Sequence, residues 1–185
     1  MAFSFSEMRY LTHIVFLFLL PATTYSQTAH VDSNRIVYKG TVKVDRVNRD
    51  ELYARAKNAL LNNAGGSKEV IVTNSSEKGM ISAKGSIRLP STYATIKTVE
   101  YILELSVDDG NYKYRIDSVY LKQVERGGKT NKISSEEILK AMDTSGPVSA
   151  NAEKQLNEID MNFQKLLDQV RTDMKETSTV KIRNN

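Results

Sequence analysis

Hydrophobic and polar residues alternate between Arg35 and Asp45, so that every second side chain is apolar or small. A period of two is typical of a strand with one buried and one solvent-exposed face. The spacing then becomes helical. Asn48 is suited to cap a helix, Glu51 occupies the capping-box position, and residues 62–66, Asn-Asn-Ala-Gly-Gly, are typical of a helix end. This part of the chain therefore predicts a strand followed by a helix.

Four more strands are predicted after this helix. Residues 70–73 and 80–89 are apolar stretches separated by turn residues, and we interpret them as a hairpin. Residues 98–107 show the cleanest alternation in the chain, and the Asp109-Gly110 pair that follows favours a type I′ turn. The strand at residues 111–124 must therefore run antiparallel to its predecessor. The β-α-β-β-β-β order predicts an α+β fold, with an antiparallel sheet and helices on one face.

Two more helices are predicted after the last strand. Residues Ser134 to Glu137 form a capping box that opens a short helix, and Gly146-Pro147 ends it. A long helix follows, with apolar residues at helical spacing. Left in water, these side chains would forfeit roughly 1.5–3 kcal/mol each, so this stripe must cover either its own sheet or another chain. The stripe consists of Leu156, Ile159, Phe163, Leu166, Leu167, Val170 and Met174.

The first residues have the pattern of a secretory signal. A basic start precedes the apolar run Ile14–Leu20, and small residues follow up to the expected cleavage site before Gln27. The run is shorter than the roughly 20 residues of a membrane-spanning helix. The absence of cysteine excludes a lipoprotein anchor, a disulfide framework and thiolate chemistry. We expect an exported protein, periplasmic or secreted, with no transmembrane span after cleavage. The alternative is an uncleaved N-terminal anchor.

The length of the chain suits one domain with appendages. We expect the following organisation: a signal peptide at 1–26, a polar N-terminal tail at 27–34, the α+β domain at 35–126, a linker with a short helix at 127–148, a long amphipathic helix at 149–177, and a C-terminal tail at 178–185.

The charged residues argue against a nucleic-acid partner. The net charge is +4, and both signs are interspersed along the chain, which is far weaker than the footprint of a nucleic-acid-binding protein. Of the two histidines, His13 lies in the signal and His30 in the polar tail. Catalytic triads and imidazole metal sites are therefore out of reach.

Two further motifs fail as catalytic sites. Gly127-Gly128-Lys129-Thr130 resembles the end of a phosphate-binding loop, but Gln123 stands where that loop requires glycine. Glu100 and Glu104 share one face of a strand, roughly 13 Å apart, which exceeds the carboxylate spacings used to cleave glycosides. We therefore predict no catalytic, cofactor-binding or metal-ligating residue.

Tyr112, Tyr114 and Tyr120 are predicted to line one side of the last strand, next to basic residues. Packing in the core is the favoured interpretation. If the rings instead face solvent, they suit a carbohydrate or peptide, because tyrosine offers an apolar face with a polar tip. The candidate residues for contact with another molecule are Leu156, Ile159, Phe163, Leu167, Val170, Met174, Tyr112 and Tyr114.

Three segments resemble the DUF4468 family. They are residues 44–56 (Val-Asp-Arg-Val-Asn-Arg-Asp-Glu-Leu-Tyr-Ala-Arg-Ala), residues 69–72 (Glu-Val-Ile-Val) and residues 79–85 (Gly-Met-Ile-Ser-Ala-Lys-Gly). These exported domains of unknown function occur mostly in Bacteroidetes. The resemblance covers residues 35–124 and implies a TBP-like α+β fold. It implies no site residues, because the family has no established active site.

The leading hypothesis is an exported, non-catalytic interaction or scaffold module of the cell envelope. It would contact an envelope protein, a peptide or a glycan through the sheet or the long helix, without a cofactor. One alternative is self-assembly, in which the stripe from Leu156 to Met174 pairs between chains. Another is a hydrolase whose serine or aspartate site the sequence does not single out.

Overall fold

The computed structural model describes residues 30–32, 34–64, 70–91 and 93–176. The predicted signal peptide and the predicted C-terminal tail lie outside these described residues.

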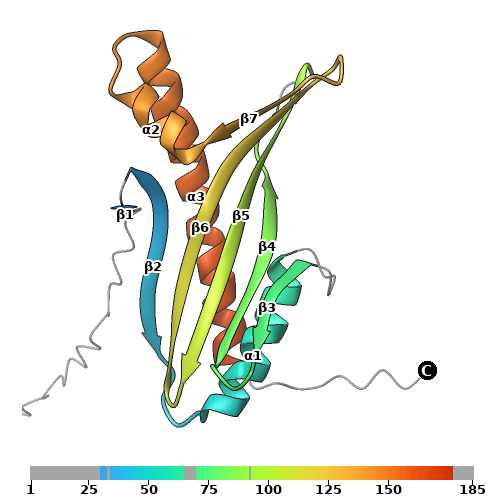
Figure 1. Ribbon diagram of the computed structural model, residues 1–185, viewed down its shortest axis with the longest axis vertical. Helices are drawn as coiled ribbons and strands as arrows, with labels where there is room; N and C mark the ends of the chain where they lie inside the picture. Colours follow the sequence, from blue (N-terminus) through green and yellow to red (C-terminus); the bar gives the residue numbers. More distant parts are fainter. Residues whose placement is uncertain (1–29, 33, 65–69, 92, 177–185) are drawn as a thin grey trace, which may run out of the picture.

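The elements follow one another in the order that Figure 1 labels. They are β1 (His30–Asp32), β2 (Arg35–Lys43), α1 (Arg49–Asn63), β3 (Ile71–Ser75), β4 (Met80–Arg88), β5 (Thr95–Asp108), β6 (Asn111–Glu125), β7 (Thr130–Ser134), α2 (Ser135–Met142) and α3 (Pro147–Lys175).

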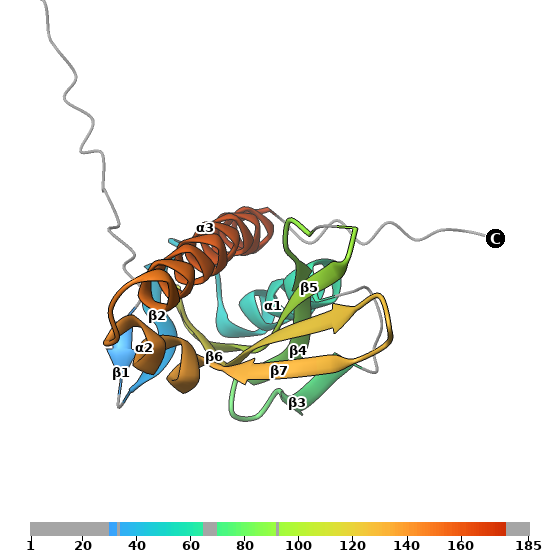
Figure 2. The ribbon, with the colours of Figure 1, turned by 90° about the horizontal axis from the view of Figure 1, so that it is seen from above.

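The strands form one antiparallel sheet in the order β1-β2-β6-β5-β4-β3, and β7 pairs with β6 off this path. Seen from above, α1 and α3 lie together on one side of the sheet (Figure 2). The predicted α+β fold, with an antiparallel sheet and a long C-terminal helix, is confirmed. We call the sheet face that packs on α1 and α3 the core face, and the opposite face the outer face.

Two strands lie in segments for which the sequence predicts a tail and a linker. β1 falls within residues 27–34 and pairs with β2, and β7 falls within residues 127–148 and pairs with β6. Gly128, with a φ of 80°, makes the turn that brings β7 back. Neither strand has an apolar alternation of its own, because each forms on the free edge of a longer strand.

The sheet forks along β6. One edge of β6 pairs with β5 over nearly its whole length. The other edge pairs first with β2, at Asn111–Ile116, and then with β7, at Tyr120–Val124. Helix α2 follows β7 directly and contacts β2, β6 and β7, so it occupies the opening between the two partner strands (Figure 1).

A β-bulge at the fork reverses which face the side chains of β6 occupy. The register between β5 and β6 shifts here, and Ser118 has a φ of 52°. Before the bulge, Tyr112 and Tyr114 are buried in the core, whereas Tyr120 after the bulge is 37% exposed. One extra residue in a strand moves the following side chains to the opposite face. The prediction that all three tyrosines share one side is therefore wrong for Tyr120.

The apolar stripe of α3 packs against the sheet of its own chain. Phe163 is fully buried, and its ring meets Tyr38 and Tyr101 edge to face, with centroid separations of 5.0 and 5.2 Å. Leu156 is partly buried. Helix α3 also packs along α1, so the long helix is part of the domain. The other buried residues of the stripe are Ile159, Leu166, Leu167, Val170 and Met174.

Helix α1 connects three parts of the fold through side chains of the segment that resembles the family. Arg49 donates to the carbonyl oxygens of the turn between β3 and β4. The hydroxyl of Tyr53 donates to Asn74 Oδ1 at 2.6 Å. Arg55 donates to two carbonyl oxygens at the end of α3. These contacts give the segment a structural role.

Candidate functional site

The outer face of the sheet carries most of the charge that the strands contribute. In strands β2 to β7 its basic residues outnumber its acidic ones. The outward-facing basic residues, placed by strand register and alternation, are Arg35, Lys39, Lys43, Lys84, Arg88, Lys113, Arg115, Lys122 and Lys132, against Glu100, Glu104, Asp108 and Asp117.

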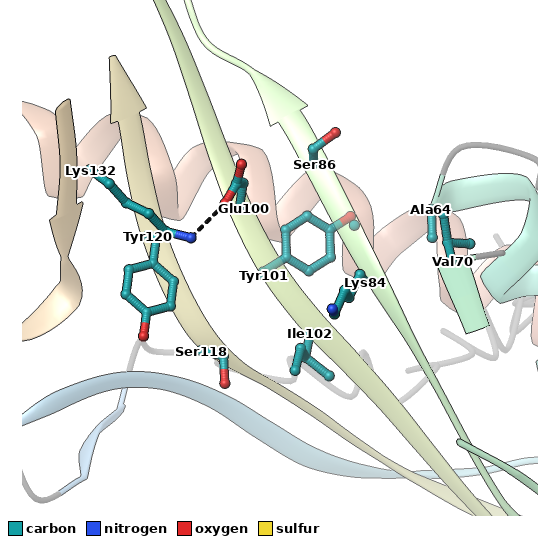
Figure 3. A pocket seen from close by; sticks show the side chains of 11 residues that line it. Ala64, Val70, Lys84, Ser86, Glu100, Tyr101, Ile102, Ser118, Tyr120 and Lys132 are labelled. Atoms are coloured by element: carbon teal, nitrogen blue, oxygen red, sulfur yellow. Dashed lines mark hydrogen bonds and ion pairs between the residues drawn. The ribbon is translucent and has the colours of Figure 1, made fainter. Parts of the chain in front are cut away.

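A depression of about 440 Å³ lies across β4, β5 and β6. This volume is within the usual range for small-molecule sites. Figure 3 shows Lys132, Glu100 and Tyr120 at one end of it and Ala64 and Val70 at the other. The remaining lining residues are Lys84, Gly85, Ser86, Tyr101, Ile102 and Ser118.

At one end of the depression, charged side chains contact one another and an aromatic ring. Lys132 Nζ lies 2.8 Å from Glu100 Oε2 and 4.3 Å from the centroid of the Tyr120 ring. Lys122 Nζ lies 3.7 Å from the other carboxylate oxygen of Glu100. The register explains this cluster, because Glu100 pairs with Tyr120 and Lys122 pairs with Lys132. The ammonium over the ring is a cation–π contact, and it restricts the ring's orientation.

Glu100 is held in its charged form. The hydrogen bond from Lys132 lowers the pKa of the Glu100 carboxyl below its ordinary value, and the charges of Lys132 and Lys122 act in the same direction against partial burial. A carboxylate that stays ionised is poorly suited to donate a proton near neutral pH. Its role in the depression is to hold the two lysines.

Lys84 provides a different kind of positive charge. It is exposed on β4 opposite Ile102 of β5, and within the described part of the chain its ammonium has no hydrogen bond or ion pair. The central strand β5 is paired on both sides here except at the bulge, where Tyr101 has no partner on β6, so most of its backbone groups are occupied. A ligand over β5 would therefore meet mainly side chains, whereas β4 from Lys84 onward has no partner among the described residues of β3.

A smaller hollow of about 120 Å³ adjoins the depression in the fork of the sheet. Both cavities are lined by Ser118 and Tyr120. The charged groups of the smaller hollow are paired with one another: Arg35 Nε lies 2.7 Å from Glu136 Oε1, and Arg115 Nε lies 2.8 Å from Asp117 Oδ2.

The structure does not place the predicted contact residues on a surface. Tyr112 and Tyr114 are buried on the core face, because they precede the bulge. The α3 residues Ile159, Phe163, Leu167, Val170 and Met174 are buried as well, and Leu156 partly so. Their apolar side chains are covered by the sheet and by α1, so they serve as core in the described fold. The surface interpretation of these residues is therefore corrected.

The sequence contains one weak indication of which residues lie on the outer face. In β6, Tyr112, Tyr114 and Ile116 alternate with polar residues, but two polar residues, Asp117 and Ser118, then precede Val119. This doubled step marks the bulge and places Tyr120 outward. Lys132 and Lys84 carry no such signal, because β7 has no pattern of its own and a lysine on a wet strand face is ordinary.

The described residues hold no group of three histidine, cysteine, aspartate or glutamate side chains arranged to bind a metal ion. Likewise, none of the helices in the described part is both long and apolar enough to cross a membrane.

The comparisons with known proteins agree with this fold. A DUF4468 family protein from Bacteroides ovatus has a crystal structure that aligns with a TM-score of 0.61 at 14% identity, over 80% of this chain and 91% of that one. A TBP-like protein from Parabacteroides distasonis aligns with a TM-score of 0.58 at 12% identity, over 77% and 97% of the two chains. At these identities the likeness shows the fold alone. No curated protein matches the chain.

The fold thus places the protein among the TBP-like α+β domains. Residues 38–122 match the family described as a domain of unknown function (DUF4468) with TBP-like fold. This match includes the segments in and after α1 on which the resemblance to the family rests. The matched region includes Lys84, Glu100 and Tyr120 and ends before β7, which supplies Lys132.

Proposed function

We propose that this protein is an exported, non-catalytic binding module of the cell envelope, and that it binds its partner on the outer face of the sheet. The proposal rests on the difference between the two faces of the sheet. The core face is filled by α1 and α3. The outer face holds the depression, the exposed Tyr120, and Lys84, which pairs with none of the described residues. Export rests on the signal pattern at the start of the sequence.

The groups in the depression suit binding better than catalysis. Its carboxylate, Glu100, is committed to two lysines. The ring of Tyr101, also at its edge, belongs to the core, and burial raises its pKa to about 12. The hydroxyl of Ser86 is on the lining, and that of Ser118, which donates to Asp117 Oδ1 at 3.1 Å, can still accept a hydrogen bond. Aromatic ring, hydroxyl and ammonium groups around a shallow depression are typical of recognition through side chains.

The location of the binding surface can be tested by NMR on residues 27–185. Protein, peptide and glycan fractions of a bacterial envelope extract would be added separately to ¹⁵N-labelled protein. We expect shift changes at Lys84, Ile102 and Tyr120 with at least one fraction, while exposed α3 residues such as Met161 stay unchanged.

Two results would contradict this proposal. One is a set of shift changes confined to the exposed side of α3. The other is turnover of an envelope polymer that a single side-chain substitution abolishes, since that would make the protein an enzyme.

A further inference from the structure

Resting on the proposed function, we infer that the outer-face depression binds an anionic glycan, that is, an oligosaccharide carrying carboxylate or phosphate groups. The charge of the lining is the first reason. The charged lining residues are Lys84, Lys132 and Glu100. Glu100 pairs with Lys132 and with Lys122, which lies next to the lining, and Lys84 is paired with none of the described residues. The site therefore has a positive surplus, which a negatively charged ligand would complement.

The exposed ring is the second reason. Tyr120 lies on the outer face with 37% of its surface exposed, and Lys132 holds its orientation. A tyrosine presents a flat apolar surface with a polar tip, and the C–H face of a sugar ring would stack on the ring face that Lys132 does not cover. Ser86 and Ser118 flank the depression. The Ser86 hydroxyl can donate to and accept from the hydroxyl groups of a glycan, and the Ser118 hydroxyl, which donates to Asp117, can accept from them.

The paired backbone is the third reason, and it favours a glycan over an acidic peptide. Extended peptides are commonly bound by strand addition, which requires a free sheet edge. The centre of this depression is β5, which has a hydrogen-bonded strand on each side. A peptide lying across β5 would leave its own amide groups with few backbone partners, whereas a glycan needs only side chains. Strand addition would instead require the edge of β4 beyond Ala83, and that edge pairs with no described residue of β3.

The spacing of the groups sets the size of the ligand. Lys84 pairs with Ile102, and Tyr120 pairs with Glu100, so the two groups lie on opposite sides of β5 and two residues apart along it. From strand spacing and rise per residue, their backbone positions are roughly 10–12 Å apart. The ligand must therefore be longer than a monosaccharide, with an acidic group near Lys84 and a ring near Tyr120.

A glycan array with carboxylated, phosphorylated and neutral oligosaccharides tests this inference on the full chain without its signal. We expect retention of acidic oligosaccharides and little retention of neutral ones. For the best binder, titration calorimetry should show at least a tenfold loss of affinity in Lys84→Gln and in Tyr120→Ala. Lys84→Arg and Tyr120→Phe should retain binding, because they keep the charge and the ring.

The matched control is Lys113→Gln, which removes a charge from the same face outside the depression and should leave affinity unchanged. Retention of carboxylated but not phosphorylated glycans, or the reverse, would identify the acidic group. The inference is overturned if no acidic glycan is retained, if neutral glycans bind equally, or if a hexaglutamate peptide binds as tightly with the same dependence on Lys84. Any of these results leaves the NMR test of the outer face to decide the proposed function separately.

Discussion

Arg55 donates from Nη1 to the backbone carbonyl oxygen of Met174, at 3.1 Å, although the two residues are 119 positions apart. A second bond reaches the carbonyl oxygen of Lys175 at 3.2 Å, and Nε lies 2.9 Å from Glu51 Oε1. The last carbonyl groups of a helix lack partners within it, and a cation there also favours the helix dipole. Arg55 thus attaches the end of α3 to α1.

Replacing Arg55 by methionine should destabilise the protein by about 2–3 kcal/mol, because hydrogen bonds to charged groups contribute this much and the carbonyls would lose their partner. Urea unfolding would measure the change. Lys57→Met, at an exposed position of the same helix, is the control and should lie within about 0.5 kcal/mol of wild type. Equal effects of the two substitutions would contradict the role of Arg55.

Phe163→Ala should reduce the free energy of unfolding by about 3–5 kcal/mol, as for other large buried aromatic residues, because it removes the ring between Tyr38 and Tyr101. Met161→Ala, 57% exposed on the same helix, should change it little. Thermal unfolding followed by circular dichroism should show one transition for the wild type. A separate early transition of the long helix would show that α3 is an appendage instead.

Gly85→Ala should destabilise the sheet, because a methyl group at this position would overlap the ring of Tyr101, which lies directly across from Gly85 on β5. Overpacking of this kind costs about 1–3 kcal/mol. The loss should shrink in a Tyr101→Leu background, and a double-mutant cycle would measure the coupling. Gly127→Ala meets no atom within 4 Å and should be tolerated. Additive effects at Gly85 and Tyr101 would argue against this contact.

The carboxyl of Glu100 should titrate below its ordinary value of 4.5. Because the pKa is lowered in the folded state, the contribution of this group to stability is present above the ordinary value and disappears as the pH falls through the folded-state pKa. Side-chain NMR should therefore show a low pKa that rises in Lys132→Met. In Lys113→Met the pKa should stay the same, and a wild-type pKa at or above 4.5 would refute the ion-paired arrangement.

The local pattern along the chain is sufficient for the elements that carry their own signal. The alternation in β2, β5 and β6 predicts strands because a half-buried sheet requires a period of two. The capping residues at Asn48 and Ser134 predict the helix starts, and both side chains accept the expected backbone bonds. The stripe of α3 predicts that the helix is covered, but leaves open whether its own sheet or a second chain covers it.

Pairing between distant residues accounts for what the pattern leaves open. The strands β1 and β7 exist because β2 and β6 offer them free edges. The stripe of α3 lies on the sheet of its own chain, where the ring of Phe163 packs edge to face against Tyr38 and Tyr101. Ser118 shifts the phase of β6 at the point where its partner changes from β2 to β7, and this shift turns Tyr120 outward beside Lys132. The spacing of apolar residues along the chain determines that there is a sheet with one face covered by helices and one face open. Which side chains gather on its open face depends on strand register, and register is set by contacts between strands far apart in the sequence.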